Sequence, residues 1–263
     1  SLNPRSYDVL FEKGLALSEL ADYTAAVSVF GQALEIDNSR KECHYARGLA
    51  FSALGQHEEA LAAFSRAVTI DPGFSESSYH KGLALEHLGR YDEAISAFDN
   101  TLAGVPDHSG AWYHRGFAAE SLGNDDDAVA AYEKARQNDT RNTEILLREG
   151  KALSRLGEFN RATRIFDAAL AIEPESGELL LEKGIALAHL DRDDEAEQVL
   201  GKSAQLMPDR FEPAFLRGLS LMLLGRNDDA VPAFDAAISL NQTDADIWFH
   251  KGMALARLER PQD

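Results

Sequence analysis

The chain has 263 residues, 44% of them hydrophobic, and a formal net charge of −18. This charge argues against binding to nucleic acid and to anionic membrane surfaces, both of which require a basic footprint. There is no apolar run long enough to span a bilayer, no signal-peptide pattern at the start, and only one cysteine, Cys43, so disulfides cannot build the fold and we expect a cytoplasmic protein.

Glycine recurs every 34 residues along the whole chain, at Gly14, Gly48, Gly82, Gly116, Gly150, Gly184, Gly218 and Gly252. A leucine follows each of these glycines by six residues, from Leu20 to Leu258. An alanine follows the first seven by twelve residues, from Ala26 to Ala230. A fixed period of this length indicates an array of repeated structural units. The glycines lie within helical patterns, which predicts close helix packing at each of them.

Each period predicts two helices joined by a tight turn. In residues 75–108 the first helix should end at Gly89, since glycine readily adopts the left-handed conformation that terminates helices. The second helix should begin near Tyr91 and carries an apolar stripe of Ala94, Ile95, Phe98 and Leu102. Acids such as Asp92-Glu93 open most of the second helices, where we expect them to cap backbone amides and to oppose the helix dipole.

This unit resembles a tetratricopeptide repeat, whose pattern is an aromatic residue, a glycine, a second apolar residue, and then Ala, Phe, Ala and Pro. Residues 109–142 match it with Trp112, Gly116, Ala128, Tyr132 and Ala135, and residues 41–74 with Gly48, Phe51, Ala60, Phe64, Ala67 and Pro72. The resemblance implies an all-α, right-handed superhelical solenoid of stacked antiparallel helix pairs. It covers residues 1–263 as a single solenoid, with repeats at 7–40, 41–74, 75–108, 109–142, 143–176, 177–210 and 211–244 and a lone terminal helix at 245–260.

Departures from the pattern predict local irregularities. Ala21 and Asp191 stand where a turn glycine is the rule, which predicts strain if the turn is left-handed. The repeat at 177–210 departs furthest, because Glu197 replaces an apolar residue, Leu200 replaces Phe, and Gly201 lies inside a helix. A glycine inside a helix costs about 1 kcal/mol, so we expect a dip in local stability there.

The last repeat and the terminal helix raise two further questions. Pro232 falls within the second helix of residues 211–244, so this helix should either begin at or after Asp228 or bend at Pro232. The helix at 245–260 has no partner. It either serves as the terminal cap of the solenoid, or the chain is a fragment of a longer array.

No pattern in the sequence predicts catalysis. There is no phosphate-binding glycine loop, no His-Glu-x-x-His, no paired Cys-x-x-Cys and no nucleophile elbow, so we expect a protein that is not an enzyme and carries no cofactor. His80 and His114 share one repeat position. Equivalent residues of stacked repeats lie about 10 Å apart, too far for two ligands of one zinc ion. We therefore expect no metal site.

The resemblance implies that the first helices line a concave groove that takes up peptides. The candidate contacts lie three residues before and one residue after the recurring glycines: Phe11, Tyr45, Leu49, Tyr79, Leu83, Tyr113, Phe117, Phe215 and Phe249. One interpretation is that they only pack. The other is that Tyr45, Tyr79 and Tyr113 form a stripe that holds an extended segment. Glu42 and Glu76 near its rim would favour basic residues in the ligand.

The repeat at 143–176 predicts a different kind of contact. Arg148, Lys151 and Arg155 lie on one side of one helix and form a candidate anion site for a carboxylate or a phosphate. The alternative is local neutralisation by Glu144 and by Glu182 of the next repeat. The lysine and asparagine clamp with which some family members grip a carboxylate terminus is absent, as is the asparagine ladder of the sugar-transferase arrays.

These features together predict a non-catalytic scaffold that binds a protein or peptide, with no nucleic-acid partner and no insertion into membranes. The alternative is a partner- or substrate-recruiting region of a larger enzyme, such as a glycosyltransferase. Self-association through the unpaired terminal helix is a further hypothesis. The sequence does not identify the partner.

Overall fold

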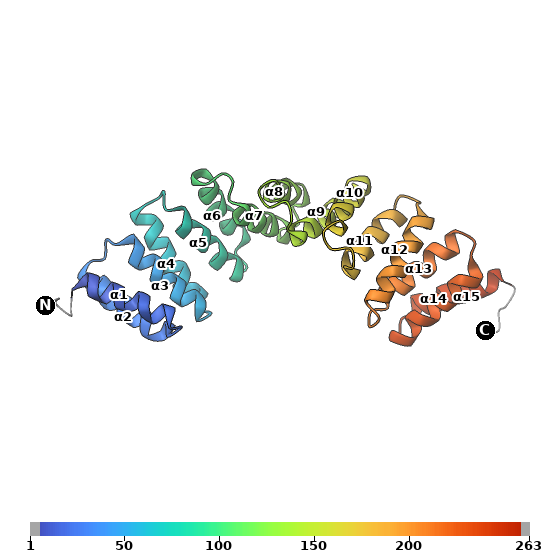
Figure 1. The fold of residues 1–263 in the computed structure, drawn as a ribbon, viewed down its shortest axis with the longest axis horizontal. Helices are drawn as coiled ribbons and strands as arrows, with labels where there is room; N and C mark the ends of the chain where they lie inside the picture. Colours follow the sequence, from blue (N-terminus) through green and yellow to red (C-terminus); the bar gives the residue numbers. More distant parts are fainter. Residues whose placement is uncertain (1–5, 259–263) are drawn as a thin grey trace. The chain divides into compact units, whose positions relative to one another are not determined.

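The computed structural model describes residues 6–258, and every regular element in that range is an α-helix. The helices follow one another in chain order (Figure 1): α1 Tyr7–Glu19, α2 Tyr23–Ile36, α3 Lys41–Ala53, α4 His57–Ile70, α5 Ser75–His87, α6 Tyr91–Gly104, α7 Ser109–Ser121, α8 Asp125–Asn138, α9 Thr143–Arg155, α10 Phe159–Leu170, α11 Gly177–Ala188, α12 Asp193–Leu206, α13 Glu212–Leu223, α14 Asn227–Leu240 and α15 Ala245–Arg257.

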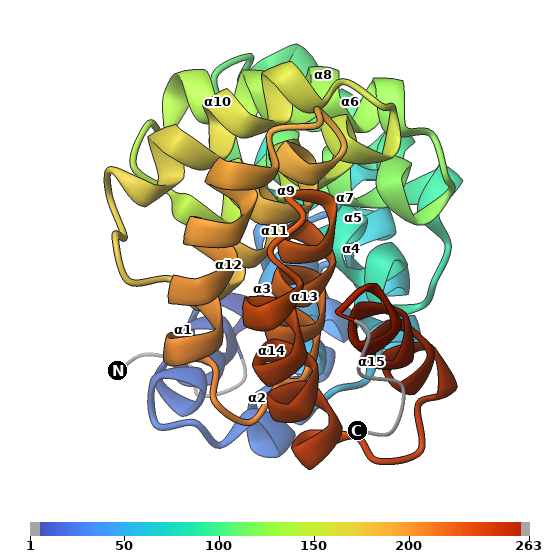
Figure 2. The same cartoon turned by 90° about the vertical axis from the view of Figure 1, so that its right-hand side faces the viewer.

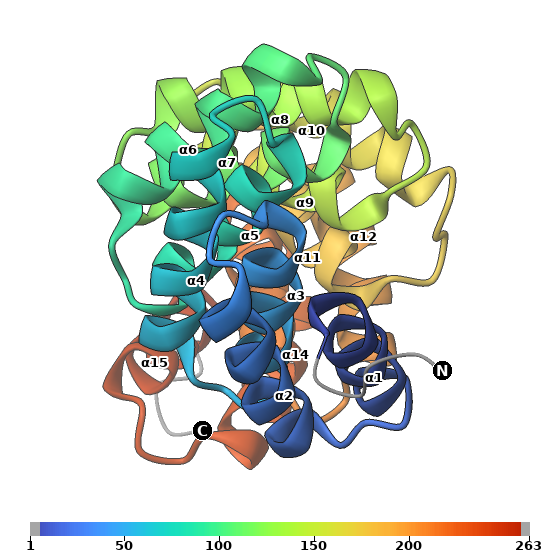
Figure 3. The same ribbon diagram turned by 90° about the vertical axis from the view of Figure 1, so that its left-hand side faces the viewer.

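The helices form two compact units, one from α1 to α8 and the other from α9 to α15. Within each unit every helix packs against the next in sequence, and each odd-numbered helix also contacts the next odd-numbered one. Figure 3 shows α3 next to α5 in the first unit, and Figure 2 shows α11 next to α13 in the second. We call the odd-numbered helices first helices and the even-numbered ones second helices. The expected all-α arrangement of stacked helix pairs is confirmed.

The recurring glycines mark where the two helices of a repeat touch. In the seven full repeats each faces the same position of the second helix, occupied in turn by Phe30, Phe64, Phe98, Tyr132, Phe166, Leu200 and Phe234. A Cβ atom on Gly82 would lie only 2.4 Å from Cε1 of the Phe98 ring, so no larger residue fits without displacing the core. A Cβ on Gly252 in α15 would meet nothing within 4 Å.

The turns inside the repeats are left-handed. The turn glycines Gly55, Gly89, Gly123, Gly157 and Gly225 have φ between 71° and 77°. Ala21 and Asp191 adopt the same conformation, with φ of 58° and 57°. A side chain is disfavoured there because its Cβ approaches the following carbonyl oxygen, so the predicted strain at both residues is confirmed.

The acids at the starts of the second helices make a different contact from the expected one. The N-cap residues of α6, α12 and α14 are arginines that form no capping hydrogen bond. They pair instead with a carboxylate of the first turn, in the pairs Arg90–Glu93, Arg192–Glu195 and Arg226–Asp229, each with a closest N–O distance of 2.7 Å. The expected capping of amides is therefore not the contact observed in these helices, although acids at these places still oppose the dipole.

The unusual residues of the repeat at 177–210 fit one another. Glu197 on α12 is buried, and Oε1 of its carboxylate accepts hydrogen bonds of 2.8 and 2.6 Å from Arg217 on α13. A Cβ on Gly201 would lie 3.2 Å from Nε of Arg217, so the glycine leaves room for the guanidinium. Oε2 of Glu197 also lies 3.7 Å from Nη1 of Arg226, so two arginines compensate a buried charge that would be strongly destabilising without a partner.

Pro232 does not delay its helix. The helix α14 begins at Asn227 and contains Pro232, so the expected start at or after Asp228 is wrong. Pro232 has no N–H, so the backbone carbonyl of Asp228 receives no hydrogen bond from the helix. The cost is limited because Pro232 is exposed and lies near the start of the helix, where water can reach this carbonyl. A bend at Pro232 stays a prediction.

Candidate functional site

The three tyrosines predicted to form a stripe are linked by histidine rings. The ring of His80 lies 5.5 Å from that of Tyr45 and 5.4 Å from that of Tyr79, measured between centroids. The ring of His114 lies 6.0 Å from Tyr79 and 5.0 Å from Tyr113. Five rings from α3, α5 and α7 thus form one continuous row, which we call the tyrosine face.

Each histidine of the tyrosine face also rests on the core. The His80 ring stacks on Phe64 at 5.6 Å, and the His114 ring stacks on Phe98 at 5.9 Å. Burial lowers the pKa of His80, and the nearby His108 lowers it further. His80 is therefore neutral near pH 7 and contributes ring surface rather than charge. The histidine rings pack between the tyrosines and the core and so hold the tyrosine rings in place. The tyrosines therefore lose little conformational entropy when a ligand binds.

Carboxylates lie beside these rings. Burial raises the pKa of Tyr45, and Glu76 raises it further; at Tyr79 burial and Glu86 act in the same way. The carboxylate of Glu86 lies 3.0 Å from Nδ1 of His114. Glu120 on α7 accepts a hydrogen bond of 2.6 Å from the hydroxyl of Tyr132. Tyr132, which stands where five other repeats have Phe, thus holds the carboxylate of Glu120 in place.

Most basic side chains of the same helices lie on another side. Arg115 on α7 pairs with Asp99 on α6 at 2.7 Å. Arg47 on α3 points toward α2, where its Nη2 would lie 3.8 Å from a Cβ on Gly31. Lys81 on α5 lines a polar pocket of about 310 Å³ together with residues of α4 and α6. Among the residues three or four positions before, or seven after, Tyr45, Tyr79 and Tyr113, the charged ones are four acids and one lysine: Glu42, Glu76, Glu86, Glu120 and Lys41. Nζ of Lys41 pairs with a carboxylate oxygen of Asp71 at 2.5 Å.

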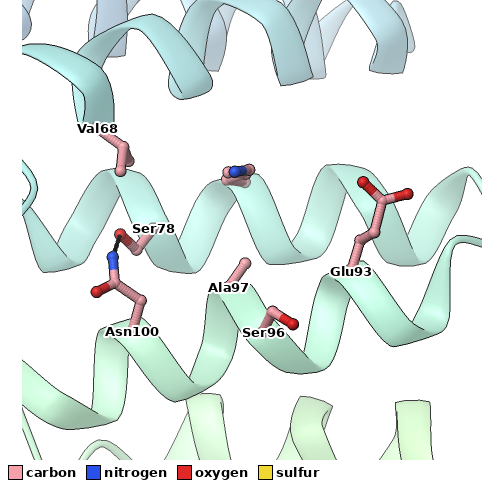
Figure 4. A pocket seen from close by; sticks show the side chains of 7 residues that line it. Val68, Ser78, Glu93, Ser96, Ala97 and Asn100 are labelled. Carbon is pink, nitrogen blue, oxygen red and sulfur yellow. Dashed lines mark hydrogen bonds between the residues drawn. The ribbon is translucent and has the colours of Figure 1, made fainter.

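A hydrogen bond joins two of the side chains that line the polar pocket. Figure 4 shows Asn100 of α6 pointing toward Ser78 of α5, and its Nδ2 donates a hydrogen bond of 2.7 Å to the serine hydroxyl. Ser78 stands where neighbouring repeats have His44 and Trp112, so the pocket arises from a missing ring. Besides this bonded pair, the lining includes the charged Lys81 and Glu93 and the apolar Val68 and Ala97.

The remaining predicted contacts lie apart from the tyrosine face or beside it. Leu49 and Leu83 are half-buried and pack on the same core cluster as Tyr45 and Tyr79, whereas Phe117 contacts Tyr91. Phe11 stacks on Tyr7 with centroids 5.8 Å apart.

Two predicted contacts belong to the second unit. Phe215 and Phe249 meet there at the ring of His250, at 5.6 and 5.3 Å. Phe249 is 62% exposed. These rings repeat, on α13 and α15, the arrangement of two rings around a histidine that builds the tyrosine face.

The candidate anion site is surrounded by carboxylates. Nζ of Lys151 lies 3.3 Å from a carboxylate oxygen of Glu178 and 3.3 Å from one of Glu182. Arg148 pairs with Glu144 at 2.7 Å. These pairs favour the interpretation of local neutralisation for Lys151 and Arg148. Arg155 is exposed at the end of α9.

The second unit contains an apolar pocket between α11 and α13. Its volume is about 210 Å³, and its lining consists of Gly184, Ile185, Ala188, His189, Leu200, Leu216, Leu219, Ser220 and Leu223. Leu223 is 70% exposed, which places it at the mouth. Among the predicted positions, only the one after each recurring glycine contributes, through Ile185 and Leu219.

Several of these residues escaped prediction from the sequence. The ring contacts of His80, His114 and His250 could not be predicted from the sequence, although each directly follows an aromatic residue, in Tyr79-His80, Tyr113-His114 and Phe249-His250. Within residues 6–258 no group of three or more His, Cys, Asp or Glu side chains could hold a metal ion. In the same range, each helix is too short or too polar to cross a lipid bilayer.

The fold has many relatives among solved structures. The C-terminal part of a repeat protein from Cytophaga hutchinsonii matches with a TM-score of 0.77 and 16% identity, over 91% of this chain and 98% of that one. A repeat protein from Parabacteroides merdae matches with a TM-score of 0.62 and 17% identity, over 95% and 98%. YrrB, described as a TPR protein with an unusual peptide-binding site, matches with a TM-score of 0.65 and 21% identity, over 70% and 95%.

Sequence comparison gives the family. No curated protein sequence matches the chain. Models of the tetratricopeptide repeat match residues 7–40, 42–74, 79–142, 147–209 and 215–263. These segments include most of the chain, and the paired helices with their recurring glycines follow the same period. The chain therefore belongs to the tetratricopeptide repeat family.

Proposed function

We propose that the chain is a non-catalytic protein-binding scaffold and that its tyrosine face binds an extended peptide rich in lysine and arginine. The observation that carries this proposal is the row of five rings flanked by acids. Tyrosine rings offer large contact areas at low entropic cost, and their faces attract cations. The acids of the same helices complement a basic ligand. Among the basic residues, Arg47, Lys81 and Arg115 lie elsewhere, and Lys41 beside Tyr45 is paired with Asp71.

YrrB gives independent support for a peptide ligand, since it shares the fold and has a peptide-binding site. The geometry of this chain supports the extended form of the ligand. The tyrosines are contributed by successive first helices, so a bound segment would cross α3, α5 and α7 and meet one ring from each.

The proposal is tested with a fluorescein-labelled nonapeptide that alternates lysine and serine, and with a matched peptide that alternates glutamate and serine. Anisotropy should detect binding of the basic peptide only, with an affinity that falls as NaCl rises because salt screens exposed charges. Replacing Tyr45, Tyr79 and Tyr113 together with alanine should weaken it at least ~10-fold, since truncating one buried aromatic contact costs ~2 kcal/mol.

The matched control replaces three tyrosines outside the tyrosine face, Tyr7, Tyr23 and Tyr91, with alanine. This control should bind the basic peptide as the wild type does, and circular dichroism should show that both triple variants remain helical. If the variant without Tyr45, Tyr79 and Tyr113 binds the basic peptide with unchanged affinity, the rings only pack and the proposal is wrong.

A further inference from the structure

A second binding site arises from a change in the core at the junction of the last two full repeats. At three other junctions the ring that faces a recurring glycine also lies against a histidine of the next first helix. The pairs are Phe64–His80, Phe98–His114 and Phe234–His250, with centroids 5.6 to 6.3 Å apart. At the junction between α12 and α13 the equivalent residues are Leu200 and Leu216.

The cavity lies where those two rings are missing. Leu200 and Leu216 both line the pocket of about 210 Å³ between α11 and α13. Leu200 is fully buried and its Cγ would lie 2.5 Å from a Cβ on Gly184, so it packs tightly on α11 but extends less far than a phenyl ring. A dry apolar cavity forfeits contacts that a fitting apolar side chain can restore. The chemical group that fits is therefore an aromatic or a large aliphatic side chain.

The mouth of this pocket differs in charge from the equivalent place in the first unit. The C-terminal ends of the first helices in the second unit read Ser154-Arg155, Ala188-His189, Met222-Leu223 and Ala256-Arg257, where His189 is the residue directly after α11. His189 and Leu223 line the pocket, and Nη1 of Arg257 donates a hydrogen bond of 3.2 Å to the carbonyl oxygen of Met222 beside it. This acceptor is a neutral carbonyl, so the contact places no negative charge beside Arg257. In the first unit the equivalent positions include Glu19, Glu86 and Glu120.

The acids on the same side of α11 and α13 are already paired. Glu178 and Glu182 lie 3.3 Å from Nζ of Lys151, and Glu212 lies 3.1 Å from Arg210. Arg257 is bonded to Met222, next to Leu223 at the mouth of the pocket, in a chain of strongly negative net charge. A ligand that carries acids beside its apolar residue complements this surface.

We propose that the pocket between α11 and α13 is a second peptide-binding site, which takes a phenylalanine or leucine side chain flanked by aspartate or glutamate. It belongs to the second unit and is independent of the tyrosine face. The same protein would then hold segments of opposite charge at two places, a basic segment at the tyrosine face and an acidic one here. The acids of α3, α5 and α7 would select a basic segment at the tyrosine face, and Arg257 would select an acidic one at the pocket.

The test uses the labelled peptide Ser-Asp-Glu-Phe-Glu-Asp-Ser and two relatives, one with alanine in place of phenylalanine and one with lysine in place of every acid. Wild-type protein should bind the parent at least ~10-fold more tightly than either relative, as judged by anisotropy. Leu200→Phe places a ring in the cavity from inside and should abolish binding of the parent while leaving the melting temperature unchanged or raised. The control Leu240→Phe makes the same change at an exposed position and should bind normally.

A second variant guards against a failure of Leu200→Phe to fold. Leu223→Glu introduces an acid at the exposed mouth and should repel the parent peptide at no cost to folding. The variant lacking Tyr45, Tyr79 and Tyr113 should bind the parent as the wild type does, which separates this site from the tyrosine face. The proposal is overturned if Leu223→Glu and Leu200→Phe bind the parent normally, or if the alanine peptide binds equally well. It is also overturned if sedimentation shows that Leu200→Phe dissociates a dimer, since the occupant would then be a second copy of the chain.

Discussion

Asp191→Gly should stabilise the protein, because aspartate occupies a turn that five other repeats build with glycine. Its φ is 57°, against 71° to 77° for the turn glycines. A left-handed conformation costs an L-residue about 1–2 kcal/mol, and aspartate lies at the lower end because its short polar side chain tolerates this region. Glycine loses more conformational entropy on folding than aspartate does, which reduces the gain by about 0.5–1 kcal/mol. The expected gain from conformation alone is therefore about 0–0.5 kcal/mol.

Electrostatics adds to this gain. Burial raises the pKa of Asp193, and the charges of Asp191 and Asp194 raise it further. Oδ1 of Asp193 is buried and lacks a hydrogen-bond partner. Removal of the Asp191 carboxylate therefore relieves a repulsion at the start of α12. Ala21→Gly measures the conformational part alone, because Ala21 has a φ of 58° and its side chain carries no charge.

The assay must be local as well as global, because a repeat array need not unfold in one step. Urea denaturation followed by circular dichroism gives the midpoint. Native-state hydrogen exchange of the Arg192 amide, which donates to the carbonyl oxygen of Leu187 at 3.0 Å, reports the turn itself. Asp191→Gly should raise the midpoint and slow exchange at Arg192, and Ala21→Gly should slow exchange at Asp22, which donates to Leu17.

The reverse substitution provides the control. A Cβ on Gly157 meets nothing within 4 Å, and the φ of this glycine is +76°. Gly157→Ala should therefore destabilise by about 1–2 kcal/mol through conformation alone, with no steric contribution. An unchanged or lower midpoint for Asp191→Gly, alongside the expected loss in Gly157→Ala, would refute the reasoning.

Two further predictions concern packing and pH. Gly82→Ala should lower the free energy of unfolding, measured by urea denaturation, by the ~1–3 kcal/mol typical of overpacking, since its Cβ would lie 2.4 Å from the Phe98 ring. Gly252→Ala should be neutral or stabilising because a Cβ there would meet nothing within 4 Å. Hydrogen bonds from Ser39 and then Arg40 lower the pKa of Asp37 from 3.8 to about 2, so its contribution is complete above the unfolded value and is lost as pH falls toward 2. Urea midpoints near pH 5 and pH 2.5 should therefore differ less in Asp37→Asn than in the wild type; an equal difference would contradict this.

The sequence by itself determined the period, the helix pairs and the places of close packing. A glycine repeated in register can be read without coordinates because its cause is local: a helix can approach its partner this closely only where there is no Cβ. The left-handed turns at Ala21 and Asp191 could be predicted for the same reason, since equivalent positions in the other repeats show which backbone conformation the turn requires.

Tertiary structure decided which side chains meet between repeats. His80 lies between Tyr45 and Tyr79 because the stacking of α5 on α3 places it there, and no local pattern gives that distance. The cavity at Leu200 and Leu216 exists because both members of one contacting pair are leucines, and the pair lies on different helices. Pairing of Lys151 with two glutamates of the next repeat likewise depends on the packing of α9 against α11. Periodicity fixes the position of a residue within its own repeat, but contacts across a junction depend on the packing geometry of two helices and on the size of both partners.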